Sequence, residues 1–419
     1  MRFILFLLSF LSSFSLMSCT EEKADTLKIG VISDIHYLSE NLMDNGEAIK
    51  ASDRAGNKMV REVPVILEQV LDDYLNSDID ILLISGDMTK DGEKQSHMDF
   101  VNKLQPLRDK GVRIFVIPGN HDINVPKPLG YKGSETYPVE NTDPGEFVKI
   151  YGDHGYNNAI KRDGSSLSYV AQLNSSTWLL AIDSNRYSEY TTRTVSSGRI
   201  LPETEQWIMD VMTEANEKDM RVIGIMHHGL VEHIMMQSVF FGEYIVEDWK
   251  RLAPLFADSG MKAIFTGHFH ANDITEYISP AGNKIYDIET GSLSTYAFPY
   301  RFVELTPHGM KITTKNVTST PDIPNLATES RLMMEDAAKR LAIGRLNAKG
   351  LVFPVETTEL ITDIIARIFV KHLEGDEVID KELETLLQKL GTQIDSPIDI
   401  SQLSKLDFEP ADNNVEISF

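Results

Sequence analysis

Five short apolar runs in this sequence each end in side chains that can bind a metal ion or transfer a proton. The first two runs, residues 27–33 and 79–86, lead into Asp34 and His36 and into Asp87. The other three, residues 112–118, 221–226 and 262–267, lead into Asn120-His121-Asp122, His227-His228 and His268-Phe269-His270. Carboxylates, amides and imidazoles together suit Mn, Fe, Zn or similar divalent ions. The residue types therefore predict a metal site.

The order of these fragments matters more than any one of them. Singly, Asp-x-His reads as a cap, Gly-Asp as a turn, and His-His as a packed pair. In an open α/β sheet, however, ligands gather outside the carboxyl ends of the strands. Residues two apart on an extended segment also point to one side, as Asp34 with His36 and His268 with His270 would. Two such ions about 3.5–4 Å apart would need one bridging carboxylate, and such a pair can activate a hydroxide and polarise a phosphoryl oxygen.

Apolar runs alternating with helical periodicity between residues 27 and 275 predict the α/β class. The expected strands are 27–33, 79–86, 112–118, 178–183, 221–227 and 262–267, with helices expected at 64–75, 98–109, 202–216 and 247–257. Residues 284–316 consist of short runs separated by turn residues, which predicts a set of antiparallel strands at the end of this domain.

Prolines in residues 318–325, STPDIPNL, mark a predicted boundary. We therefore expect a catalytic domain at 27–318 and a helical C-terminal extension at 319–419. Its helices are expected at 326–345, 356–374 and 380–390. The last dozen residues are predicted to be a loosely held tail.

The charge of the chain narrows the possible partners. The 419 residues carry a formal net charge of −23. Such a surface repels polyanions, which argues against nucleic-acid polymers and acidic membrane surfaces as partners. A small anionic substrate remains compatible where local cations outweigh this field.

The first 19 residues have the features of an export signal. Arg2 precedes an almost wholly apolar or hydroxyl-bearing stretch that is short for a membrane span. Leu16-Met17-Ser18-Cys19 resembles the lipobox of bacterial lipoproteins, in which the cysteine is acylated; the alternative is a plain signal peptide. Cys19 is the only cysteine, so no intramolecular disulfide can form. We expect an exported protein of the bacterial cell envelope, anchored to the membrane at Cys19 through a tether at 20–26.

Taken in order, the motifs D-x-H, GD, GNHD, H and GHxH resemble the calcineurin-like metallophosphoesterase superfamily over about residues 27–315. The resemblance implies a four-layer αββα sandwich holding two metal ions. Asp34, His36 and His270 would hold one ion, and Asp87 would bridge to a second held by Asn120, His227 and His268. His121 would face the substrate, stabilising a phosphoryl oxygen or protonating the leaving group. Asp122 would orient His121 or its loop, and the family pattern favours His227 over His228 as the ligand.

The surrounding residues favour one branch of that superfamily. GDMTKDGE at residues 86–93 lacks the tyrosine of purple acid phosphatases and the GDYVDRG of serine/threonine phosphatases. It resembles the GDL-x-x-DGE form of class III cyclic-nucleotide phosphodiesterases. HHGLVEH at 227–233 departs from their usual His-His-Pro-Pro. Together with a helical C-terminal extension on a lipoprotein, it looks more like the Gram-positive cyclic phosphodiesterase-like subgroup.

We therefore predict hydrolysis of a phosphodiester by a metal-bridging hydroxide, with cyclic nucleotides as the first substrate class to consider. One alternative is a phosphomonoesterase or glycerophosphodiesterase that scavenges phosphate, and another is a catalytically silent, lipid-tethered binding protein. Three cations, Lys90, Arg186 and Arg193, either contact phosphate or face solvent. Five apolar residues either wall a substrate pocket or pack against the C-terminal helices: Met235, Met236, Phe240, Phe241 and Tyr244.

Overall fold

The computed structural model describes residues 26–393 and 410–419. The predicted signal peptide, Cys19 and residues 20–25 of the predicted tether lie outside the described residues. None of the helices within the described ranges combines the length and apolar character needed to cross a membrane.

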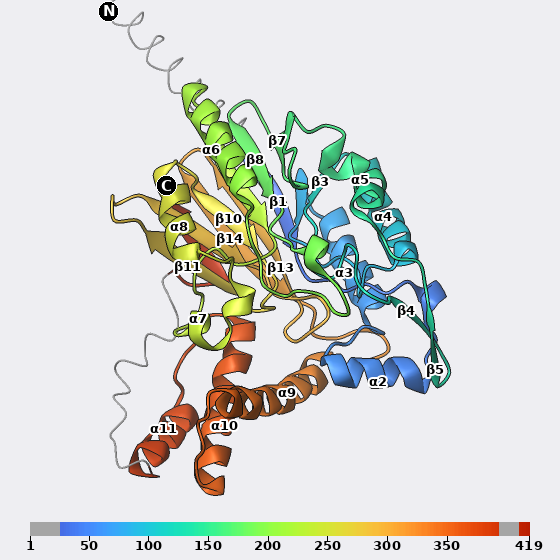
Figure 1. The fold of residues 1–419 in the computed structure, drawn as a ribbon, viewed down its shortest axis with the longest axis vertical. Helices are drawn as coiled ribbons and strands as arrows, with labels where there is room; N and C mark the ends of the chain where they lie inside the picture. The colour runs from blue at the N-terminus through green and yellow to red at the C-terminus, as the bar shows by residue number, and fades with distance from the viewer. Residues whose placement is uncertain (1–25, 394–409) are drawn as a thin grey trace, which may run out of the picture.

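Two large sheets form the centre of the fold (Figure 1). The first has the strand order β15-β14-β13-β1-β2-β3. Its strands are β1 (Leu27–Ile32), β2 (Ile81–Ile84), β3 (Arg113–Val116), β13 (Pro299–Thr306), β14 (Gly309–Asn316) and β15 (Asn414–Ser418). The strands β1, β2 and β3 are parallel to one another, whereas β13 runs antiparallel to β1.

The second sheet has the order β11-β12-β10-β9-β8-β7-β6. Its strands are β6 (Lys161–Arg162), β7 (Tyr169–Gln172), β8 (Thr177–Ile182), β9 (Arg221–Met226), β10 (Ala263–Thr266), β11 (Asp273–Ile278) and β12 (Lys284–Glu289). The strands β8, β9, β10 and β12 are parallel, so their carboxyl ends lie at one edge.

Alternation along β8 shows how the layers are stacked. Leu179 and Ala181 belong to the core between the two sheets, whereas Leu180 and Ile182 pack with the helices α6 (Pro202–Glu217) and α8 (Trp249–Asp258). On the far side, α3 (Val63–Leu75) and α4 (Lys94–Asp109) cover the first sheet. Successive strand side chains point to opposite faces, so each sheet contacts the other sheet on one face and helices on the other. The predicted four-layer αββα sandwich is confirmed.

Shorter elements lie around these layers. The hairpin β4 (Leu129–Lys132) and β5 (Glu135–Pro138) packs beside α2 (Glu47–Gly56). The remaining short helices are η1 (Glu40–Leu42), α5 (Pro144–Ile150), η2 (Gly152–Tyr156), η3 (Tyr187–Glu189), α7 (Gln237–Phe240) and η4 (Gly242–Tyr244). None of these was predicted, because their sequences are short or carry no regular apolar period.

In the described part of the C-terminal region, the helices are α9 (Leu326–Ala348), α10 (Val355–Glu374) and α11 (Lys381–Gln393). Figure 1 shows them together at one end of the sandwich, with α9 reaching toward α2. The expectation of a loosely held tail is wrong for residues 410–419. They form β15, which pairs antiparallel with β14 and buries Ile417 in the main core. The tail is therefore part of the first sheet, a long-range pairing that its local sequence does not indicate.

Candidate metal centre

The predicted ligands all follow strands that end at the same edge of the fold. Asp34, Asp87 and Asn120 come after β1, β2 and β3, while His227 and His268 come after β9 and β10. Five ligand positions adopt positive φ values: Asp34 at 49°, His36 at 48°, Asp87 at 49°, His268 at 74° and His270 at 66°. Left-handed backbone is uncommon outside glycine and accumulates at functional sites. The chain turns sharply after each strand, and this places the side chains over the strand ends.

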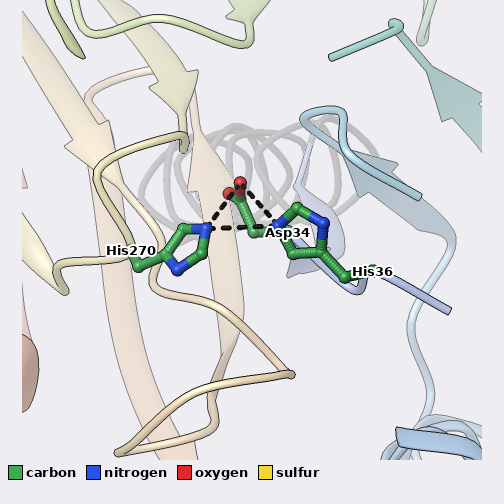
Figure 2. A group of neighbouring side chains, drawn as sticks. All are labelled: Asp34, His36 and His270. Carbon is green, nitrogen blue, oxygen red and sulfur yellow. Dashed lines mark hydrogen bonds and ion pairs between the residues drawn. The ribbon is translucent and has the colours of Figure 1, made fainter. Parts of the chain in front are cut away.

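The first ligand cluster consists of Asp34, His36 and His270 (Figure 2). His36 Nε2 lies 3.2 Å from His270 Nε2, and Asp34 Oδ1 lies 3.9 Å and 3.4 Å from these two nitrogens. Asp34 Oδ2 accepts hydrogen bonds from Ser33 Oγ and from the His268 amide. Asp34 Oδ1 is buried without a hydrogen-bond partner. A buried carboxylate oxygen beside two imidazole nitrogens is the donor set that a divalent ion requires.

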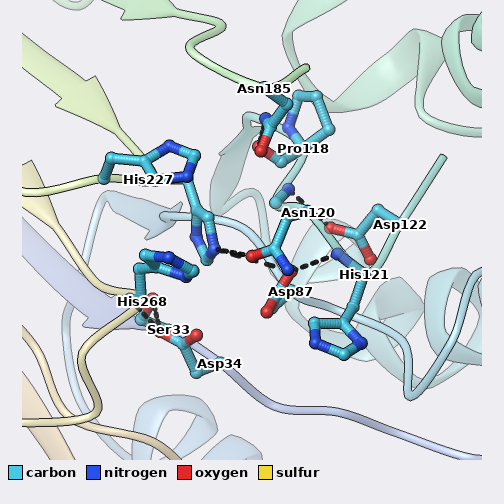
Figure 3. A network of polar contacts seen from close by, with 12 residues as sticks. Ser33, Asp34, Asp87, Pro118, Asn120, His121, Asp122, Asn185, His227 and His268 are labelled. Atoms are coloured by element: carbon cyan, nitrogen blue, oxygen red, sulfur yellow. Dashed lines mark hydrogen bonds and ion pairs between the residues drawn. The ribbon is translucent and has the colours of Figure 1, made fainter. Parts of the chain in front are cut away.

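The second cluster consists of Asp87, His227 and His268, with Asn120 beside it (Figure 3). His227 Nε2 lies 3.6 Å from Asp87 Oδ1 and 3.1 Å from Asn120 Oδ1. The other carboxylate oxygen of Asp87, Oδ2, lies 3.5 Å from His36 Nε2 of the first cluster. Asp87 thus directs one oxygen to each cluster, which is the placement that a bridging ligand requires.

The doubled histidine resolves into two different environments. His227 donates through Nδ1 to the carbonyl of Ser85, 2.8 Å away, which leaves Nε2 facing Asp87 and Asn120. His228 uses both ring nitrogens elsewhere, at 2.7 Å from Ser184 Oγ and 3.0 Å from the carbonyl of Ser196. Burial, followed by the charge of His227, lowers the pKa of His228 to about 3. The structure therefore brings His227, and not His228, to the ligand cluster.

Two glycines make this close packing possible. A Cβ added at Gly119 would lie 2.2 Å from Asp87 Oδ1, and one at Gly267 would lie 2.4 Å from Asp34 Oδ2. Both distances are far below van der Waals contact. The glycines in GNHD and GHFH therefore let the backbone approach the two carboxylates.

The charge balance of the centre fits bound cations. Burial raises the pKa of Asp87, but the neighbouring His227 and His121 outweigh it and hold that pKa well below its usual range. Burial also lowers the pKa of His36 and of His268, which keeps their ring lone pairs free. At His227 burial is outweighed by Asp87, and the pKa rises to about 9. A metal ion would replace that proton, because ligand imidazoles must be neutral.

The contacts of His121 differ from those expected. His121 Nδ1 lies 3.0 Å from the carbonyl of Lys90 and 3.0 Å from Asp91 Oδ1. The carboxylate of Asp122 does not hold this ring; it accepts from the amides of Gly119 and Thr89 at 2.8 Å and 3.0 Å. Of the two roles considered for Asp122, orienting His121 or its loop, the contacts match the loop. Asp91, within the GDMTKDGE stretch, is the residue beside His121, and only its position next to the GD motif signalled it.

A lysine that no motif indicated also reaches the centre. Lys58 Nζ lies 3.0 Å from His36 Nε2, and the residue follows Asn57, which ends α2 in a left-handed conformation. The three cations considered from sequence behave differently. Lys90 pairs with Asp91, Arg186 pairs with Glu189 and Glu247, and Arg193 is exposed.

A cavity of about 290 Å³ opens over the two clusters. Asp87, Asn120, His121, His268 and His270 line it on one side, together with Lys58. Of the apolar residues considered for a pocket wall, Tyr244 lines the cavity, whereas Met235 and Met236 are exposed. Phe241 packs against Phe269, with ring centroids 5.4 Å apart.

The layered α/β fold places two metal-ligand clusters at its strand ends, an arrangement suited to a metal-dependent hydrolase. A family model described as calcineurin-like phosphoesterase matches residues 27–272, and the chain belongs to this family. It is therefore an enzyme that acts on phosphate esters, as the motifs predicted.

Comparison with solved structures gives more distant similarities. A dimetal phosphatase from Danio rerio matches with a TM-score of 0.48 and 11% identity, over 70% of this chain and 96% of that one. A purple acid phosphatase from yellow lupin (Lupinus luteus) seeds matches with a TM-score of 0.45 and 13% identity, over 70% of this chain and 52% of that one. No curated protein matches the sequence.

Proposed function

We propose that this enzyme hydrolyses the phosphodiester bond of a small molecule, with a cyclic nucleotide as the first substrate to test. The observation that carries the proposal is the position of Asp87 between the two ligand clusters, with His121 on the same cavity wall. GDMTKDGE and GNHD, the motifs that favour the phosphodiesterase branch, supply both residues.

Asp34, His36, His270 and Asp87 would hold one ion, and Asp87, Asn120, His227 and His268 the other. Ions bound there would polarise a phosphoryl oxygen and activate water as the nucleophile. We propose Mn, Fe or Zn, since carboxylate and imidazole donors suit all three.

His121 acts on the departing side of the reaction. Hydrolysis adds water to phosphorus and breaks the bond to the leaving oxygen, which must gain a proton. With Nδ1 engaged by Lys90 and Asp91, His121 presents Nε2 to the cavity that it lines. In its protonated form, His121 donates this Nε2 proton to the leaving oxygen. The buried Asp122 holds the loop that carries His121.

We further propose that the protein is exported and anchored to the bacterial cell envelope through a lipid on Cys19. The support is the lipobox-like LMSC at residues 16–19 after an apolar stretch. Its substrate would then be a small phosphoester met outside the cytoplasm. The net charge of −23 disfavours nucleic-acid polymers.

The test uses the chain from Thr20, stripped of metal and reloaded with Mn, Fe or Zn. Turnover is measured on bis(p-nitrophenyl) phosphate, p-nitrophenyl phosphate, a glycerophosphodiester, and 2′,3′- and 3′,5′-cyclic AMP, with metal content counted in parallel. Diester turnover with two metals per chain is expected. Turnover of monoesters alone would favour the phosphatase alternative, and glycerophosphodiester turnover without cyclic-nucleotide turnover would favour the other scavenging role. Two metals without turnover of any ester would favour a binding protein, and no bound metal would overturn the proposal.

A further inference from the structure

The roof of the cavity comes from the C-terminal helices, outside the part of the chain that carries the motifs. On α9, Met334, Ala337, Ala338 and Leu341 line it, and their i, i+3, i+4, i+7 spacing places them on one helix face. On α10, Phe369 and Leu373 line it, one turn apart. All six side chains are apolar. The opposite wall carries the ligand clusters, so one side of the cavity is charged and the other is apolar.

The helix α9 is fixed on both sides of the cavity mouth. Arg340 Nη2 donates to Asn57 Oδ1 at 2.8 Å, next to Lys58. About one and a half turns further along α9, Arg345 pairs with Glu243 and lies over the ring of Phe241, 5.2 Å from its centroid. Lys339 joins α9 to Asp363 of α10 at 2.7 Å. The roof is therefore attached to the walls on both sides of the metal clusters.

The small size of two roof residues leaves room beside the metal clusters. Ala337 and Ala338 face the cavity where longer side chains would fill it. At about 290 Å³ the cavity is near the lower end of small-molecule sites, which span roughly 300–1,000 Å³. Such a space admits one compact monomeric ligand.

We propose that α9 and α10 form a binding subsite for the organic group of the substrate, and that this group carries an aromatic or heteroaromatic ring. The inference rests on the proposed function, which places the phosphate at the metal clusters opposite this roof. An aromatic or heteroaromatic ring gains by leaving water for an apolar wall. A glycerol-like group would lose hydrogen bonds to water there, because none of the six roof side chains can replace them. The subsite therefore favours ring-bearing phosphoesters over glycerophosphodiesters.

The first test measures binding without turnover. Phenylphosphonate and methylphosphonate present the same anionic group to the metal clusters and differ only in the organic group. Calorimetric titration of the metal-loaded chain from Thr20 should show phenylphosphonate binding at least tenfold more tightly. Equal affinities for the two ligands would overturn the subsite.

Two roof variants test its location. Ala338→Leu should fill the subsite and reduce the phenyl preference to less than threefold while leaving methylphosphonate affinity and metal content unchanged. Leu341→Ala opens the roof without overpacking and should also weaken the preference. The matched control is Ala348→Leu, an exposed position on the same helix that should behave like the wild type.

Kinetics gives the second readout, with substrates that share one leaving group. Since the p-nitrophenyl leaving group of both esters faces His121, the two esters differ only in the second ester group, which the roof contacts. Ala338→Leu should therefore raise KM for bis(p-nitrophenyl) phosphate about tenfold and change KM for methyl p-nitrophenyl phosphate less than threefold. An unchanged phenyl preference in both roof variants would place the organic group elsewhere and overturn the inference. If the phenyl preference depends on the roof but no diester is hydrolysed, the proposed function fails and the subsite stands.

Discussion

His121 lies at the edge of the ligand clusters and is held from one side. Asp91 and the carbonyl of Lys90 contact Nδ1, and the ring meets that of His36 edge-on with centroids 5.0 Å apart. Asp91 therefore selects the ring orientation while Nε2 remains available, as a carboxylate commonly does for a catalytic histidine.

Replacing His121 should separate metal binding from turnover. His121→Ala is expected to retain both metals and to lose roughly 10²–10⁴ in kcat on an ester with a poor leaving group. The loss should shrink for p-nitrophenyl esters, because p-nitrophenolate departs without protonation. Asp91→Asn should cause a smaller loss in kcat, because the side chain at position 91 loses its charge but can still contact the His121 ring. Steady-state kinetics beside metal analysis checks this, with the exposed His308→Ala as the control. Full activity of His121→Ala on a poor leaving group would refute the role.

Asp87 and Asp34 should differ in how many ions they hold. Since Asp87 directs one oxygen to each cluster, Asp87→Ala is expected to bind fewer than one metal per chain. The unpartnered oxygen of Asp34, Oδ1, faces only His36 and His270 of the first cluster, so Asp34→Ala should retain about one. Metal counting after dialysis distinguishes these outcomes, with the exposed Asp78→Ala as the control. Equal stoichiometry in the two variants would contradict a bridging Asp87.

Among the elements, α10 is fixed to the sandwich by a buried ionic group. His372 lies near the C-terminal end of α10. Its Nδ1 atom lies 2.5 Å from Glu377 Oε1 and 3.7 Å from Asp273 Oδ2 of β11. These three residues could in principle hold a metal. In the structure, His372 Nδ1 donates a hydrogen bond to Glu377 Oε1, and this group anchors α10 behind the cavity roof.

This anchor should weaken as the pH rises. Burial lowers the pKa of His372, but Glu377, Asp273 and Glu289 outweigh it and the pKa is raised. A histidine whose pKa in the folded protein exceeds its unfolded value of about 6.5 contributes its full stabilisation of the folded state at pH values below 6.5. The contribution is then lost as the pH rises through the folded pKa.

Glu377→Ala is therefore expected to destabilise the protein most at pH 6, by on the order of 3 kcal/mol, because the variant leaves a buried charge without its partner. The difference from the wild type should shrink above neutral pH. Denaturant unfolding at pH 6 and pH 9 measures it, and the exposed Glu382→Ala serves as the control. A difference that grows with pH would show that His372 is not the titrating partner.

At the scale of the whole chain, one prediction concerns the proposed lipid anchor at Cys19 and the membrane location that it would give the enzyme. Cys19→Ser is expected to release the protein from the membrane fraction of a bacterial host without changing its specific activity, because the site lies in residues 34–270. Fractionation and the mass of the N-terminal peptide check this, with Thr20→Ser as the control. Wild-type protein found wholly in the soluble fraction would refute the lipid anchor.

Much of the fold follows from local patterns. The helices expected at 64–75, 202–216 and 356–374 occur as α3, α6 and α10 within a residue or two, because each has an apolar stripe and clear end signals. The strand β15 and the hairpin β4–β5 could not be predicted, since their stability comes from partners distant in sequence or from packing on other elements.

The amino-acid sequence alone determined the chemistry of this protein. Residue types that can bind a metal follow the strands, and the resemblance of their order to the calcineurin-like phosphoesterases implied the ligands Asp34, His36, Asp87, Asn120, His227, His268 and His270. The tertiary structure decided what surrounds them. Lys58 beside His36, Asp91 in place of Asp122 beside His121, and the apolar roof from α9 and α10 depend on segments far apart in the chain. Only packing, which joins surfaces by shape and burial rather than by motif, brings those segments together.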